Sequence, residues 1–286
     1  MKITDIINDS KYSLSFEVFP PKTTDKYDTI SNAVKQIASL NPSYISVTYG
    51  AGGGTSAYTA KIAQEVQSLG ITSLAHLSCI SSTKEQVNIE LSKLKELGIE
   101  NILALRGDKQ SDINQNSLDF KYAFELIDLI KNNGDFCIGG ACYPECHPES
   151  YSVEKDMEYL KMKIDHGCDF LTTQMFFDND IFYSFIDRLR KTHLQTPVIP
   201  GLMPVTSISQ LERIVSLSGN ALPKTFMQIV DKYKEDPISF RKASIDYTIN
   251  QARGIYENGF NAVHIYTMNK PDVACEIKNN LLDVIK

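Results

Sequence analysis

Short apolar segments alternate with longer amphipathic segments along the chain. The short segments are rich in apolar and β-branched residues, as buried strands are, and cover residues 13–20, 44–49, 73–79, 101–105, 137–143, 170–177, 197–203 and 262–266. Between them, apolar residues recur three and four positions apart, which indicates helices with one buried face. The clearest helices are predicted over residues 26–40, from a cap at Ser82 or Thr83 to Gly98, and over residues 271–285.

This order of strands and helices predicts an α/β fold with parallel strands. Eight repeats within 286 residues fit a closed (β/α)8 TIM barrel, and we predict a single domain over residues 1–286. An open doubly wound sheet is the competing architecture. It fits less well, because residues 50–54 (GAGGG) do not match G-x-G-x-x-G and no glycine-rich turn follows the first strand. Longer inserts interrupt the repeat at residues 109–119 and 219–238.

Composition narrows the class of protein. Lys and Arg total 29 and Asp and Glu total 35, so the net charge is −6 with neutral histidines. This acidity argues against a dedicated nucleic-acid-binding protein. No apolar run approaches the roughly 18 residues that a membrane-spanning helix needs, and the first residues lack a signal-peptide core. We therefore expect a cytoplasmic protein that binds neither nucleic acid nor membranes.

The six cysteines raise the question of disulfides or a metal. A chain of this length can build its own core, so reduced thiols are expected. Residues 142–147 (CYPECH) could supply thiolates and an imidazole to zinc. No second cluster with ligand spacing completes the set, so small buried thiols are the favoured interpretation and no metal site is predicted.

Polar residues recur at the carboxyl ends of the predicted strands, where (β/α)8 barrels assemble their active sites. A single one could be a buried structural group, but their recurrence at one end favours a site. They are Glu17, Thr48, Tyr49, His76, Arg106, Gly107, Asp108, Tyr143, His147, Gln174 and Tyr266.

Glu17 lies between Phe16 and Val18 in an apolar strand. An apolar environment favours a protonated carboxyl group, as a general acid requires. The alternative is a structural carboxylate paired with an arginine inside the barrel.

Two further groups have competing interpretations. Arg106 and Asp108 flank Gly107, which would let a ligand approach closely; the alternative is a local ion pair that closes a turn. Asp156 and Lys163 share one helix face with the residue between them, Tyr159. That face either meets the polar loop at residues 143–147 or is simply solvated.

Several of these segments, in this order, resemble methylenetetrahydrofolate reductases. They span most of the chain from about residue 10 to residue 275, and together they are far more specific than any one alone. They are residues 15–22 (SFEVFPPK), 46–51 (SVTYGA), 76–79 (HLSC), 105–108 (LRGD), 143–149 (YPECHPE), 173–178 (TQMFFD), 200–204 (PGLMP) and 264–269 (HIYTMN). The resemblance implies a flavin-containing (β/α)8 barrel of the compact bacterial type.

The resemblance also implies a reaction. FAD would take hydride from NADH or NADPH and pass it to 5,10-methylenetetrahydrofolate, giving the 5-methyltetrahydrofolate that supplies methionine synthesis. Glu17 matches the family's catalytic acid, which would protonate N10 of the folate. Asp108 matches an aspartate near flavin and folate, where an anion would stabilise the iminium cation. A homo-oligomer is expected on the same ground.

Binding residues are carried over from the resemblance in the same way. Gln174 and Gln210 match positions that contact folate or nicotinamide, and Lys270 stands where an arginine contacts the glutamate tail of the folate. The FAD-binding positions are Thr48, Tyr49, Ala51, His76, Arg106, Gly107, Asp108, Tyr122, Ala123, Tyr143, His147, Asp156 and Lys163.

The chain departs from the family pattern at some of these places. Tyr159 and Met162 replace an asparagine and an arginine near the FAD phosphates, Ser150 replaces a small alanine, and Lys270 keeps a charge but lacks the arginine fork. Two other functions remain open: a barrel reduced by an iron–sulfur partner protein, and a protein that only sequesters folate or flavin. Glu17 together with Asp108 argues against the second, because binding needs no acid. The sequence leaves NADH and NADPH undistinguished.

Overall fold

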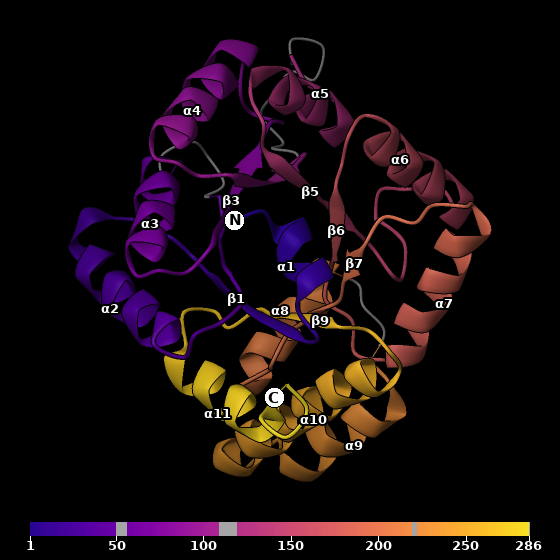
Figure 1. The fold of residues 1–286 in the computed structure, drawn as a ribbon. Helices are drawn as coiled ribbons and strands as arrows, with labels where there is room; N and C mark the ends of the chain where they lie inside the picture. The colour runs from indigo at the N-terminus through magenta and orange to yellow at the C-terminus, as the bar shows by residue number, and fades with distance from the viewer. Residues whose placement is uncertain (50–55, 109–118, 219–221, 286) are drawn as a thin grey trace.

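A computed structural model describes residues 1–49, 56–108, 119–218 and 222–285. The predictions made for Ala51, for the glycine run at residues 50–54 and for most of the first insert lie outside the described residues. The described strands form one sheet in which every neighbouring pair is parallel, in the order β7-β6-β5-β4-β3-β2-β1-β9-β8. Helices surround this sheet on the outside (Figure 1).

The strands are β1 Ser13–Val18, β2 Ile45–Val47, β3 Ser73–Ser78, β4 Asn101–Leu105, β5 Cys137–Cys142, β6 Phe170–Thr173, β7 Val198–Ile199, β8 Gly201–Leu202 and β9 Ala262–Ile265. The helices are α1 Ile3–Asp9, α2 Tyr27–Ala38, α3 Ser56–Ser68, α4 Lys84–Glu96, α5 Ala123–Asn133, α6 Val153–Asp165, α7 Asn179–Lys191, α8 Ile208–Ser218, α9 Lys224–Tyr233, α10 Pro237–Glu257 and α11 Pro271–Leu281, with a short 3₁₀ helix η1 at Thr24–Lys26.

The predicted seventh strand is divided by Pro200 into β7 and β8. β7 pairs with β6 and β8 pairs with β9, so these consecutive pieces join the two ends of the sheet and close the barrel. Proline has no N–H to donate to a ladder, but the Pro200 carbonyl still accepts a hydrogen bond from the His264 N–H at 2.9 Å. The predicted (β/α)8 TIM barrel is confirmed.

Other boundaries differ from the prediction for local reasons. The sixth strand ends at Thr173 instead of residue 177: the Gln174 N–H still donates to the Cys142 carbonyl of β5, but the Met175 N–H donates to the Gln174 side chain at 3.0 Å and not to a neighbouring strand. The second insert contains α9, and α1 precedes the first strand; neither helix was predicted.

The barrel interior is layered from apolar to polar. Inward-facing residues near the amino ends of the strands form an apolar layer that includes Tyr44, Leu103 and Phe170. The buried face of α1, at Ile3, Ile6 and Ile7, belongs to the same cluster and lies over the barrel centre (Figure 1). Two residues further along β2, β3, β6 and β9, the inward positions are polar: Ser46, His76, Thr172 and His264. Any site inside the barrel therefore faces the opposite, carboxyl end.

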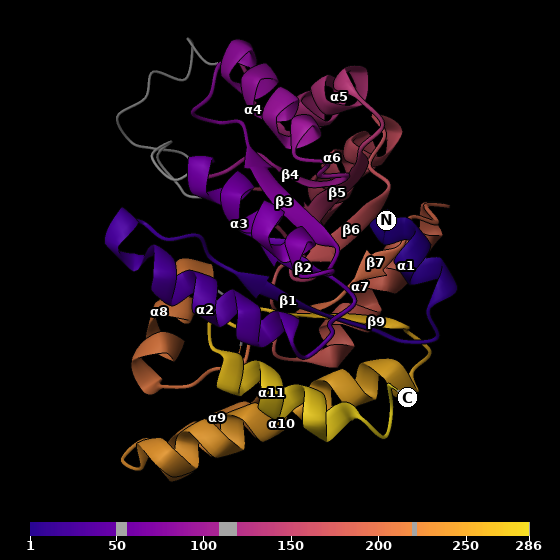
Figure 2. The same ribbon diagram turned by 60° about the vertical axis from the view of Figure 1, so that its left-hand side comes forward.

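A second apolar cluster supports the last third of the chain. It joins the loops after β6 and β8 to α8, α9 and α10 through residues that include Phe177, Phe226 and Phe240. Figure 2 shows α9, α10 and α11 gathered on one side of the barrel. Within the described ranges, no helix is long and apolar enough to cross a membrane.

Candidate active site

Glu17 is an inward-facing residue of β1 and is only 6% exposed. The sheet register places Ser46 of β2 directly beside it, and the Ser46 hydroxyl donates to Glu17 Oε2 at 3.3 Å. Two histidine Nε2 atoms lie near the same oxygen, His76 at 3.5 Å and His264 at 3.8 Å. The partners described for this carboxyl are thus a serine and two imidazoles rather than the arginine of the alternative interpretation.

His76 is a neutral neighbour of Glu17. Burial lowers the pKa of its imidazole to about 4, against an opposing effect of the nearby carboxyl. Its Nε2 atom is buried and has no hydrogen-bond partner within the described part of the chain. At neutral pH this ring therefore contributes no positive charge to the site.

The backbone around Glu17 is held by the loop that follows β9. The Thr267 hydroxyl donates to the Glu17 carbonyl at 2.7 Å. Asn269 accepts from the Phe19 N–H at 2.7 Å and donates to the Phe19 carbonyl at 3.0 Å. Met268 and Asn269 both adopt left-handed φ angles, 55° and 58°, which bring the amide to this position. This segment carries part of the family resemblance, but no role was predicted for Thr267 or Asn269.

The loop after β4 carries Arg106, Gly107 and Asp108. The Arg106 guanidinium forms a two-point contact with Glu149, at 3.0 and 2.7 Å, so the ion-pair partner described for it is Glu149 and not the Asp108 of the alternative interpretation. Gly107 has a φ of 89°, and a Cβ there would lie 2.2 Å from the Ser78 hydroxyl oxygen. The Asp108 side chain is exposed. Glu149 ends residues 143–149, one of the segments that carry the family resemblance, but its pairing with Arg106 was not predicted.

The loop after β5 joins three of the predicted residues. Tyr143 and His147 meet edge to face with ring centroids 4.5 Å apart, and the His147 N–H donates to Asp156 Oδ2 at 3.2 Å. Burial raises the pKa of Tyr143 to about 12, lowers that of His147 and raises that of Asp156. The polar loop and the start of α6 therefore form one connected group.

Lys163 and Tyr159 show that the α6 face is not simply solvated. The Lys163 ammonium donates to the Ala141 carbonyl at 2.7 Å, and burial lowers its pKa. Tyr159 stacks on Tyr122, which precedes α5, with centroids 5.1 Å apart. The solvated-face alternative is therefore wrong for Lys163.

The predicted folate-side residues converge only in part. Gln210 Oε1 accepts from both the N–H and the hydroxyl of Thr206, at 2.9 and 2.8 Å, and the Lys270 ammonium donates to the same hydroxyl. Gln174 lies in the loop after β6, where its side-chain oxygen accepts a hydrogen bond from the Met175 N–H. The role of Thr206, which links Gln210 to Lys270, was not predicted from the sequence.

The remaining predicted positions lie on the same loops. Thr48 and Tyr49 follow β2 and are partly exposed, and Ala123 is the buried first residue of α5. All six cysteines are free. Among the residues that the structure describes, no group of three or more His, Cys, Asp or Glu side chains is arranged to hold a metal ion.

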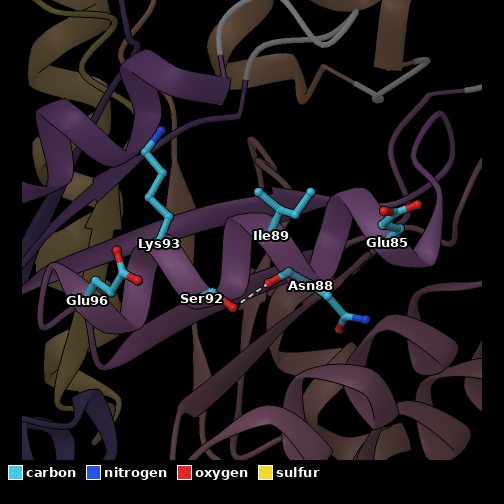
Figure 3. Close-up of a pocket in the computed structure, with 6 residues that line it drawn as sticks. All are labelled: Glu85, Asn88, Ile89, Ser92, Lys93 and Glu96. Carbon is cyan, nitrogen blue, oxygen red and sulfur yellow. Dashed lines mark hydrogen bonds between the residues drawn. The ribbon is translucent and has the colours of Figure 1, made fainter.

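A surface pocket lies away from these groups, along α4 (Figure 3). All its lining residues come from this one helix: Glu85, Asn88, Ile89, Ser92, Lys93 and Glu96. The opposite face of α4, at Val87, Leu91 and Leu94, packs on the barrel. The pocket is thus on the outer surface and does not communicate with Glu17.

The chain is similar to known proteins over most of its length. The profile of the methylenetetrahydrofolate reductase family matches residues 2–282. A 5,10-methylenetetrahydrofolate reductase of Pectobacterium carotovorum is 32% identical, over 95% of this chain and 90% of that protein. Methylenetetrahydrofolate reductase 1 of Schizosaccharomyces pombe is 33% identical, over 91% of this chain but only 44% of its own length.

The solved structures show the same fold. An uncharacterized protein from Clostridium thermocellum that binds two copies of 5-methyl-5,6,7,8-tetrahydrofolic acid has a TM-score of 0.69 at 17% identity, over 98% of this chain and 99% of that one. At that identity the likeness concerns the barrel alone. The match of the family profile over nearly the whole length, with the bacterial relative above 30% identity, establishes that this chain belongs to the methylenetetrahydrofolate reductase family.

Proposed function

We propose that this protein reduces 5,10-methylenetetrahydrofolate to 5-methyltetrahydrofolate with electrons from NADH or NADPH, and so supplies methyl groups for methionine synthesis. The observation that carries the proposal is Glu17, a carboxyl group enclosed in the polar layer of the barrel. Among the described residues, this carboxyl group has no partner of fixed positive charge, and burying such a group costs free energy. A protein that only bound folate would gain nothing in return.

Glu17 acts as the general acid. Protonation of N10 lets the N10–methylene bond break, which leaves an iminium cation at N5, and hydride addition to that carbon gives the methyl group. Enclosure keeps water from competing for the proton, while Thr267 fixes the Glu17 backbone. Asp108, an exposed residue of the loop after β4, supplies negative charge to the cationic folate.

The residues around the loops after β2 to β5 suit FAD. A diphosphate requires cations and N–H donors, and a flavin or adenine ring requires flat partners. Arg106 and Lys163 provide the cations and Tyr122 and Tyr143 the rings, while the backbone at Gly107 permits close approach. When bound, FAD would carry hydride between nicotinamide and folate.

The full set proposed to hold FAD is Thr48, Tyr49, Ala51, His76, Arg106, Gly107, Asp108, Tyr122, Ala123, Tyr143, His147, Asp156 and Lys163. Gln174, Gln210 and Lys270 are proposed to hold the folate or the nicotinamide. Arg106 already pairs with Glu149, so a phosphate must share this guanidinium or displace the carboxylate. We further propose a single domain, a homo-oligomer and a cytoplasmic location.

Anaerobic mixing tests the proposal. NADH is added first to the purified holoprotein and methylenetetrahydrofolate second, while the flavin absorbance is followed. We expect bleaching in the first step and recovery of the absorbance in the second, with 5-methyltetrahydrofolate as product. A protein that carries no flavin after FAD is supplied, or that stays bleached with the folate present, would contradict the proposal.

A further inference from the structure

His264 of β9 is a buried polar group next to Glu17 to which the proposed reaction gives no role. It is 2% exposed. The register pairs it with Ser15 across β9 and β1, and pairs Glu17 with Ser46 across β1 and β2. Because inward-facing side chains of adjacent strands lie side by side, these four residues form a row across the polar layer.

The row is a continuous set of hydrogen-bonding contacts. His264 Nδ1 lies 2.7 Å from the Ser15 hydroxyl oxygen and Nε2 lies 3.1 Å from that of Ser46. Ser46 in turn donates to Glu17 Oε2 at 3.3 Å. The ring itself is held on both sides: Tyr44 stacks on it at 5.6 Å and Tyr266 meets it edge-on at 5.2 Å.

Two proton arrangements fit these contacts. In the first, Ser15 donates to Nδ1, Nε2–H donates to Ser46, and the Ser46 hydrogen points to Glu17. In the second, Nδ1–H donates to Ser15, whose hydrogen points to the Val263 carbonyl at 3.3 Å, and Ser46 donates to Nε2. The second removes the hydroxyl donor from a buried carboxyl oxygen, which costs free energy. The first arrangement is therefore favoured.

We infer that His264 is a positioning residue for Glu17: its Nε2–H fixes the Ser46 hydroxyl as a donor to Oε2, so that the acidic proton of Glu17 resides on Oε1. The contacts of this carboxyl with Ser46, His76 and His264 all involve Oε2, which leaves Oε1 to carry the proton. This inference rests on the proposed function, in which Glu17 is the acid.

Matched variants separate this role from simple packing. In His264→Gln the side-chain amide can still donate to Ser46, whereas in His264→Asn it is too short and reaches only toward Ser15. We expect His264→Asn and Ser46→Ala to slow the oxidation of the reduced enzyme by methylenetetrahydrofolate on the order of 10²-fold, the cost of a misplaced catalytic group. His264→Gln should stay near the parent rate, and flavin reduction by NADH should change little in all three. Equal loss in His264→Gln and His264→Asn, or equal loss in both half-reactions, would contradict the inference.

The tautomer is measured directly on the parent holoenzyme. Nitrogen-15 labelling of the five histidines, with His264 assigned by the signals lost in His264→Gln, should show Nε2 protonated and Nδ1 unprotonated at neutral pH. An Nδ1–H tautomer or an imidazolium would overturn the inference even if no variant folds. A parent enzyme that leaves the folate unreduced would contradict the proposed function instead, so the two failures are distinguishable.

Discussion

At the residue scale, the proposed chemistry depends on one proton that Glu17 delivers. Glu17→Gln keeps size and hydrogen-bonding capacity but has no acidic proton. We expect oxidation of the reduced flavin by methylenetetrahydrofolate to fall by roughly 10²–10⁴-fold, the usual contribution of general acid catalysis. Reduction by NADH is a hydride transfer that needs no protein acid, so it should remain within about tenfold of the parent. Stopped-flow absorbance measures both steps.

A thermal melt of the same variant provides the control. If Glu17 were mainly structural, its neutralisation would lower the melting temperature and slow both half-reactions alike. That pattern would contradict the catalytic assignment.

His76 gives the folded protein a pH dependence at acidic pH. Its pKa is about 4 in the folded protein and 6.5 ordinarily, so the unfolded chain takes up a proton in this range that the folded chain excludes. Stability should therefore fall as the pH drops from 6.5 to 4, by about 3 kcal/mol from this group. Denaturant unfolding of the apoprotein at several pH values should show a shallower fall in His76→Gln. His193→Gln, at an exposed histidine, is the matched control and should follow the parent.

At the element scale, the loop after β9 fixes the end of β1 through Asn269. Asn269→Ala removes both hydrogen bonds to Phe19 and places alanine at a φ of 58°. We expect a loss of about 1–3 kcal/mol in the free energy of unfolding, together with slower folate reduction. Asn258→Ala, which removes an exposed hydrogen bond to the Gly254 carbonyl at the end of α10, is the control and should cost less. Equal losses in the two variants would show that the loop does not fix β1.

The elements also show what could be predicted from sequence. Buried parallel strands are continuous apolar runs, so β4 was placed at its observed bounds and β1, β3, β5 and β9 to within two residues. The break at Pro200 was missed because its effect depends on pairing with two different strands. α1 was missed because seven residues give little periodicity.

The site was predictable only as far as strand ends could be identified. Glu17 was found because a charged residue inside an apolar strand is conspicuous. Its partners Ser46 and His264 were not assigned, because register between strands far apart in sequence is set by the closed barrel. The pairing of Arg106 with Glu149 likewise joins loops after different strands.

At the scale of the whole molecule, the barrel is closed by an apolar layer and α1 at one end and carries its polar groups toward the other. The proposed FAD-binding residues belong to several separate loops after β2 to β5 and to α6. A ligand that contacts all of them links loops that follow different strands. Binding should therefore stabilise the entire domain and not one segment.

This gives the last prediction, which distinguishes FAD from FMN. A ligand at 100 times its Kd stabilises the folded state by about 2.7 kcal/mol, so FAD added to the apoprotein should raise the melting temperature by several degrees. FMN lacks the second phosphate and the adenosine, so it should leave Arg106 or Lys163 without a phosphate and stabilise less at equal concentration. Lys163→Met removes the ammonium while keeping the stem, and should reduce the shift with FAD more than that with FMN. Lys161→Met, on the exposed side of the same helix, should retain both shifts. Equal stabilisation by the two flavins, with no effect of Lys163→Met, would show that the loops hold only the flavin ring and its first phosphate.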